Sequence, residues 1–139
     1  MNRWTNQFRN QLQKGVVDVM LRVSFGASGA PTIASDTLNH KRASLGVTSI
    51  VRVSAGLYTV TFQDSFQQLY DARVMWLEAA AGTFPASPIM SVNAASPTNV
   101  NAAPGVLQIQ FCNTSSVATD PASGEIAHMT FVMGNSTAL

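Results

Sequence analysis

The sequence predicts an all-β protein: an antiparallel β-sandwich, jelly-roll-like, preceded by a short N-terminal arm of helical or extended structure. Apolar and polar residues alternate along most of the chain, as at Tyr58, Val60 and Phe62, which are separated by threonines. Residues two apart share one face of a strand, so this period indicates half-buried β-structure. Glycine and proline interrupt these runs at short intervals. Because 139 residues suit a single domain, we expect an arm at residues 1–14 and one sandwich domain at residues 15–139.

The arm is distinct from the rest of the chain. It contains three large apolar residues spaced four apart, which places them on one face of a short helix, and three basic residues but no acidic one. These are the candidate partner-binding residues: Arg3, Trp4, Phe8, Arg9, Leu12 and Lys14.

Two interpretations of the arm are open. It is either a helix packed on its own domain with a solvated basic face, or an arm whose Trp4 and Phe8 anchor a neighbouring protein with an acidic surface. Aromatic anchors of this kind dominate the binding energy of interfaces. A nucleic-acid-binding arm would carry a denser basic block, so we expect no nucleic-acid partner.

From Gly15 onward the hydrophobic period is two. We expect seven or eight strands, at residues 17–25, 32–34, 47–53, 57–63, 73–80, 88–93, 107–111 and 125–133. Ser54-Ala55-Gly56 forms a tight hairpin turn between two of them, because its glycine can adopt a positive φ. The expected core is the apolar side of the alternations: Val19, Leu21, Val23, Tyr58, Val60, Phe62, Leu107, Ile109, Phe111, Met129 and Phe131.

Two segments depart from simple alternation. Residues 64–71 predict a helical turn or a bulged link with Phe66, Leu69 and Tyr70 turned inward. The strand at 73–80 is apolar on both faces, which is typical of a strand in the middle of a sheet or at a subunit contact. Its large apolar residues are Val74, Met75, Trp76 and Leu77.

The chain is poor in charge. Charged residues make up 11% of the sequence, against about 25% in average globular domains. Such a surface favours a protein packed against copies of itself or against a larger particle, and we expect a homotrimer. The net charge of +1 gives no general attraction to nucleic acid or membranes. Neither a signal-peptide core nor a membrane-spanning run is evident, so we expect synthesis in a cytoplasm and no membrane partner.

No group of residues predicts catalysis, a cofactor or a metal site. Cys112 is the single cysteine, expected as a small buried thiol. His40 and His128 lie in unrelated contexts, and His128 is expected on the face of the last strand rather than as a metal ligand. Four aromatic residues could line a carbohydrate groove but are interpreted as core: Tyr58, Phe62, Trp76 and Phe111. We therefore expect that the protein is not an enzyme.

Three motifs occur in a characteristic order. They are Arg52-Val-Ser-Ala-Gly-Leu-Tyr-Thr-Val-Thr-Phe62, Leu107-Gln-Ile-Gln-Phe111 and the turn Asp120-Pro-Ala-Ser-Gly124. This order resembles the decoration or cement proteins of tailed-bacteriophage heads, over residues 15–134. The resemblance implies a trimeric virion protein, made in the bacterial host, that binds the major capsid protein on the capsid surface. It implies no catalytic residues.

Three classes of function remain open at this point. A capsid decoration protein would be found in purified heads that lack tails. A module of a head or tail fibre would bind a host receptor or glycan through its loops. The third class comprises a small β-sandwich enzyme or a soluble carrier.

Overall fold

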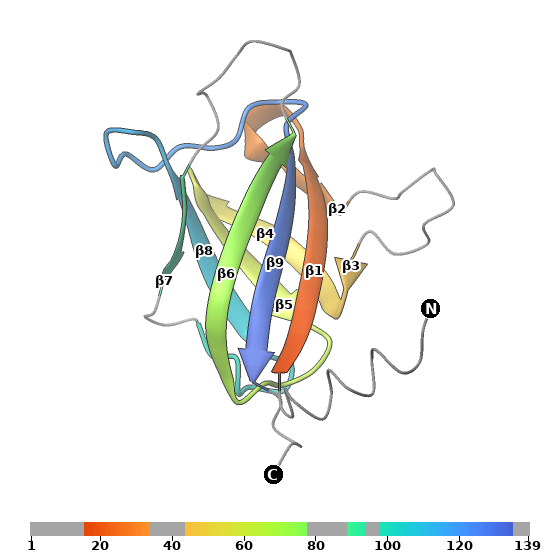
Figure 1. Cartoon of the computed structure of the whole chain (residues 1–139). Helices are drawn as coiled ribbons and strands as arrows, with labels where there is room; N and C mark the ends of the chain where they lie inside the picture. The colour runs from red at the N-terminus through yellow and green to blue at the C-terminus, as the bar shows by residue number, and fades with distance from the viewer. Residues whose placement is uncertain (1–15, 34–43, 78–88, 94–97, 135–139) are drawn as a thin grey trace.

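The protein is an antiparallel β-sandwich, as the sequence predicts. A computed structural model describes residues 16–33, 44–77, 89–93 and 98–134, and in these residues two sheets pack face to face (Figure 1). The more specific jelly-roll-like form stays a prediction. The predicted arm at residues 1–14 also stays a prediction, because it lies outside the described residues.

Sheet A has five strands. Its main path runs β2 (Pro31–Ile33), β1 (Val16–Phe25), β9 (Ile126–Gly134) and β6 (Gln68–Leu77), and β3 (Ser44–Leu45) pairs with β1 beside β2. β1 and β9 pair over their whole common length without a register shift. The inner face of both strands is apolar along the paired length, which pins the register because a slip of one residue would turn that face outward.

Sheet B has four strands in the order β4 (Val47–Ser54), β5 (Leu57–Phe62), β8 (Val106–Cys112) and β7 (Ile89–Asn93). The predicted hairpin between β4 and β5 is confirmed, with Gly56 at φ +69° in its turn. A short 3-10 helix, η1 (Ala27–Gly29), follows β1.

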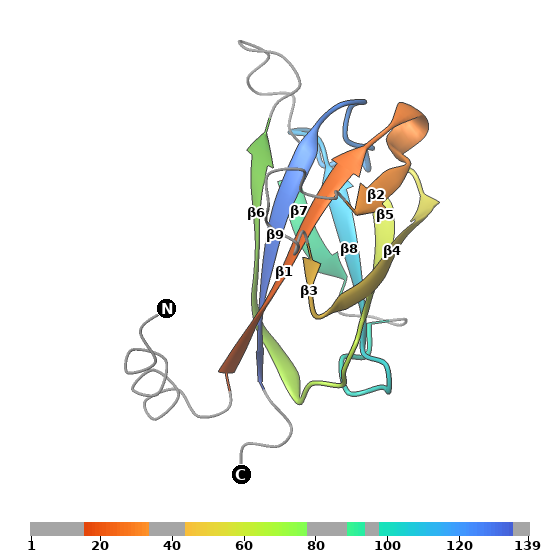
Figure 2. The same ribbon diagram turned by 90° about the vertical axis from the view of Figure 1, so that its right-hand side faces the viewer.

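The core lies between the two layers (Figure 2). All eleven residues predicted for it are buried, each with 2% or less of its surface exposed. Aromatic rings pack across the two sheets. The ring centroids of Phe62 of β5 and Phe131 of β9 are 5.7 Å apart, and those of Phe111 of β8 and Trp76 of β6 are 5.2 Å apart. Each large apolar side chain buried in this way contributes about 1.5–3 kcal/mol to the free energy of unfolding. These aromatic contacts between the sheets are therefore a main source of stability.

The predicted link at residues 64–71 is partly wrong. β6 already begins at Gln68, and its pairing with β9 shifts register between Leu69 and Asp71. Phe66 is buried and Leu69 packs against the core as expected, but Tyr70 is 53% exposed. The bulge explains the difference, because an extra residue in one strand redirects the side chain next to it.

The position of β6 also differs from one expectation. Among the strands that the structure describes, β6 ends the path of sheet A, so it is an edge strand there and not a strand in the middle of the sheet. Val74 and Trp76 pack against the core, whereas Met75 and Leu77 point outward and are 58% and 40% exposed. The remaining expectation, a subunit contact at this strand, stays a prediction.

Candidate functional site

The six candidate residues of the arm lie outside the described residues: Arg3, Trp4, Phe8, Arg9, Leu12 and Lys14. The structure does place His128, which lies on the outer face of sheet A as expected. Cys112 was expected to be buried but is partly exposed. It alternates with Ile109 and Phe111 of β8, whose side chains fill the core, so its own side chain belongs to the outer face.

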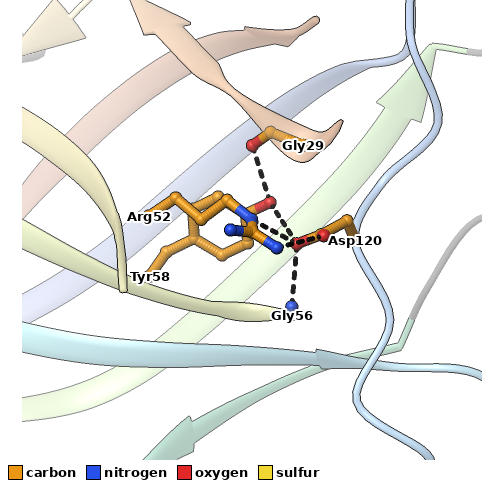
Figure 3. Close-up of polar contacts among 5 residues, drawn as sticks. All are labelled: Gly29, Arg52, Gly56, Tyr58 and Asp120. Atoms are coloured by element: carbon orange, nitrogen blue, oxygen red, sulfur yellow. Dashed lines mark hydrogen bonds and ion pairs between the residues drawn. The ribbon is translucent and has the colours of Figure 1, made fainter. Parts of the chain in front are cut away.

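The described residues contain one polar cluster that joins distant parts of the chain. Asp120 receives two hydrogen bonds from the Arg52 guanidinium, Nε to Oδ1 at 3.0 Å and Nη2 to Oδ2 at 2.7 Å (Figure 3). The amide of Gly56 donates to Oδ1 at 2.8 Å. The Tyr58 hydroxyl lies 3.0 Å from Oδ1 and 2.8 Å from the carbonyl oxygen of Gly29. We call these five residues the Asp120 clamp.

The clamp ties three connections of the fold to one carboxylate. Asp120 lies between β8 and β9, Gly56 lies in the β4–β5 hairpin, and Gly29 ends η1. Two of these positions require glycine. A Cβ on Gly56 would lie 2.4 Å from the Phe111 carbonyl oxygen, a Cβ on Gly29 would lie 2.5 Å from the Tyr58 hydroxyl, and both residues have positive φ.

The electrostatics of the clamp are those of a structural ion pair. The hydrogen bond from Arg52 lowers the pKa of Asp120 to about 2, with further support from the Gly56 amide. Burial raises the pKa of the Tyr58 hydroxyl, and its hydrogen bond with Asp120 raises it further. Asp120 is therefore ionised and Tyr58 protonated at neutral pH, so neither group is poised to exchange a proton there.

A second feature is the outer face of sheet A, where β6, β9 and β1 lie side by side (Figure 1). Arg22 of β1 is the register partner of His128 of β9, and His128 is in turn the partner of Met75 of β6. The two neighbouring rows contain the apolar residues Met20, Ile126 and Leu77 beside Ser24, Thr130 and Arg73. We define the Arg22–His128 patch as Met20, Arg22, Met75, Leu77, Ile126 and His128.

The patch combines exposed apolar surface with a cation. Met20, Met75 and Leu77 are 48%, 58% and 40% exposed. Nε of Arg22 is buried and has no hydrogen-bond partner in the described residues. Burial lowers the pKa of His128, and the charge of Arg22 lowers it further. At neutral pH the patch therefore carries the permanent charge of Arg22 beside an uncharged imidazole.

The described residues contain neither a metal site nor a membrane-spanning helix. No three of their His, Cys, Asp and Glu side chains are grouped so that they could hold a metal ion. None of their helices is long and apolar enough to cross a membrane.

Comparisons of the chain with protein-family models, with curated proteins and with solved structures find no match. The assignment of function therefore rests on the residues of this chain.

The Asp120-Pro turn is predictable from the sequence, but the clamp is not. Arg52 and Asp120 are 68 residues apart, and no spacing rule connects them. One signal was present: Arg52 shares a face with Ile50, a buried residue of the same strand. A charged residue on the inner side of a strand needs a partner, because an unpaired charge is costly to bury.

Proposed function

We propose that this chain is a virion structural protein that binds the outer surface of a phage capsid and stabilises contacts between major capsid subunits. The observation that carries the proposal is the outer face of sheet A, where Met20, Met75 and Leu77 expose apolar surface on paired strands. Exposed apolar patches on a regular sheet are typical of protein-binding surfaces.

Two further properties support this function. Few charges oppose close packing, since only 11% of the residues are charged. The inner faces of β1, β9 and β6 pack on the core, which fixes the strands that carry this surface, so binding costs little conformational entropy. A protein that binds the assembled shell better than its separate subunits stabilises the shell by mass action.

The test measures binding to purified phage heads from which this protein has been removed. Wild-type protein should co-sediment with the heads at a fixed copy number relative to the major capsid protein. Met75→Glu should bind at least about tenfold more weakly, because it places a charge within the apolar contact. Val53→Glu is the matched control: Val53 lies on β4 of the other sheet and is 56% exposed, close to the 58% of Met75.

Two results would contradict the proposal. The first is wild-type protein that does not bind heads. The second is protein found with tails or fibres in fractionated particles and retained by host oligosaccharides, which would assign it to a fibre module instead.

A further inference from the structure

We infer that the Arg22–His128 patch receives an acidic side chain of the partner protein, with the carboxylate on Arg22 and apolar contacts around it. This inference rests on the proposed function, in which the carboxylate belongs to the major capsid protein. It names the chemistry of the contact, which the proposed function leaves open.

Arg22 is the residue that selects an anion. Its guanidinium is always charged and presents donors in a planar fork that fits a carboxylate. Nε is already buried and lacks a hydrogen-bond partner in the described part of the chain. Leaving such a donor unsatisfied is unfavourable. Because Nε itself is covered, a carboxylate of the partner would pair with the terminal nitrogens of the guanidinium and neutralise its charge.

Arg73, the other arginine of this face, is a poorer candidate. Its Nε is already paired with the carboxylate of Asp71, and its side chain is 71% exposed. An exposed charge of this kind contributes little to binding. Arg22 instead shares its register row with His128 and Met75, and Ile126 and Leu77 lie in the next row. A partner packed on these apolar side chains would exclude water from the ion pair.

A second copy of this chain that used the same patch would fit less well than an acidic partner. Two copies related by a two-fold axis through the patch would bring Arg22 close to Arg22 and His128 close to His128. Like charges facing each other at an interface disfavour that pairing. The charge of the patch therefore points to a partner of opposite sign.

His128 would make this contact sensitive to pH. The charged groups that share the face are Asp18 and Arg22 on β1 and Asp71 and Arg73 on β6. Both acids pair in register with Val132, four residues from His128, which is about 13 Å along the strand. Before the partner binds, Arg22 is therefore the charged group of this face that lies beside the His128 imidazole, and its charge lowers the pKa of that imidazole. A bound carboxylate would favour the imidazolium, so binding would take up a proton and tighten as the pH falls.

The experiment measures affinity for heads lacking this protein between pH 5.5 and 8. Arg22→Gln should weaken binding at least about tenfold at pH 7, whereas Arg73→Gln, which removes the same charge from the same face, should change it less than about threefold. Wild-type affinity should rise from pH 8 to 5.5, by up to about threefold for each half-unit by which binding raises the pKa of His128. His128→Gln should abolish that rise.

The outcomes separate the two proposals. Wild-type protein that does not bind heads overturns both. Wild-type binding that Arg22→Gln leaves unchanged overturns this inference alone. Equal losses in Arg22→Gln and Arg73→Gln would show an effect of net charge and would also overturn it. Circular dichroism of each variant checks that the sandwich is folded.

Discussion

At the scale of single residues, Asp120 organises one end of the sandwich. Its Oδ1 atom accepts hydrogen bonds from Arg52 and Gly56, and the Tyr58 hydroxyl is also within reach. That hydroxyl has one proton and two acceptors, Asp120 and the carbonyl of Gly29. It donates to one of them at a time, so the strength of the clamp comes mainly from the ionised carboxylate and the two-pronged contact with Arg52.

The clamp makes stability depend on acid. The pKa of Asp120 is lowered from 3.8 to about 2 in the folded protein, so the unfolded state binds the proton more readily. The stabilisation is fully present above pH 3.8 and is lost as the pH falls toward 2, and it amounts to about 2 kcal/mol. Urea unfolding between pH 7 and pH 2 should show this loss, and Asp120→Asn should remove that part of the pH dependence.

Asp71→Asn is the control for this measurement. Asp71 is also paired with an arginine, but the pair is exposed and of low expected strength. The unfolding free energy of Asp71→Asn should stay within about 0.5 kcal/mol of wild type. If both variants behave alike, the clamp does not stabilise the fold.

At the scale of elements, strands and their inner faces were predictable because alternation is a local property. The side chains of Val19, Leu21 and Val23 all face the core, because residues two apart lie on the same face of a strand. The exposure of Tyr70 was not predictable, because a bulge depends on how two strands pair. The edge position of β6 depends on strand order in the same way.

The same distinction between local and long-range properties applies to the candidate sites. Which residues share a face, such as Arg22 and Met20, follows from the alternation within β1. That Arg22 lies beside His128 depends on the pairing of strands more than 100 residues apart in the sequence. The Asp120 clamp depends on three connections meeting in space. Local patterns therefore predict surfaces but not the clusters that form on them.

The β4–β5 hairpin requires a glycine in its turn. Gly56→Ala should lower the unfolding free energy by at least about 2 kcal/mol, because the new Cβ meets the Phe111 carbonyl oxygen at 2.4 Å and φ is +69°. Gly26→Ala is the matched control, since its Cβ would have no neighbour closer than 3.7 Å. Thermal unfolding followed by circular dichroism measures both. An equal effect of the two substitutions would show that the clash is relieved by a backbone shift.

The arm at residues 1–14 provides a prediction at the same scale. The core of the described residues begins at Val17, so deletion of the arm should leave the sandwich folded. Attachment to heads should weaken, and Trp4→Ala alone should cost about 1–2 kcal/mol of binding if Trp4 is a central anchor. Co-sedimentation with heads measures this effect. Truncated protein that decorates heads as tightly as the full chain would show that the arm is only a tail.

At the scale of the whole molecule, the sheet edges favour self-association. β6 ends one sheet and β7 ends the other, and few charged residues are present to protect such edges from pairing with other chains. Ile89 of β7 is 61% exposed. Contacts between copies at these edges would leave the Arg22–His128 patch, on the sheet face, available to another partner.

We therefore predict a homotrimer that associates through its edges. Sedimentation equilibrium at micromolar concentration should give three times the mass of the chain. Ile89→Lys should shift the equilibrium toward smaller species, because a charge on an edge strand opposes pairing. A wild-type protein that is monomeric both in solution and on the particle would refute this prediction.

The pairing of β1 with β9 has a consequence for rearranging the chain. Val16 and Gly134 are register partners on neighbouring strands, and such strands lie about 4.8 Å apart. A short linker could therefore join the two positions covalently. New ends could be opened at the exposed turn of Ser115 and Ser116, where no strand is cut. The resulting circular permutant would keep every strand pairing of the sandwich, and its N- and C-termini would lie in the connection between β8 and β9.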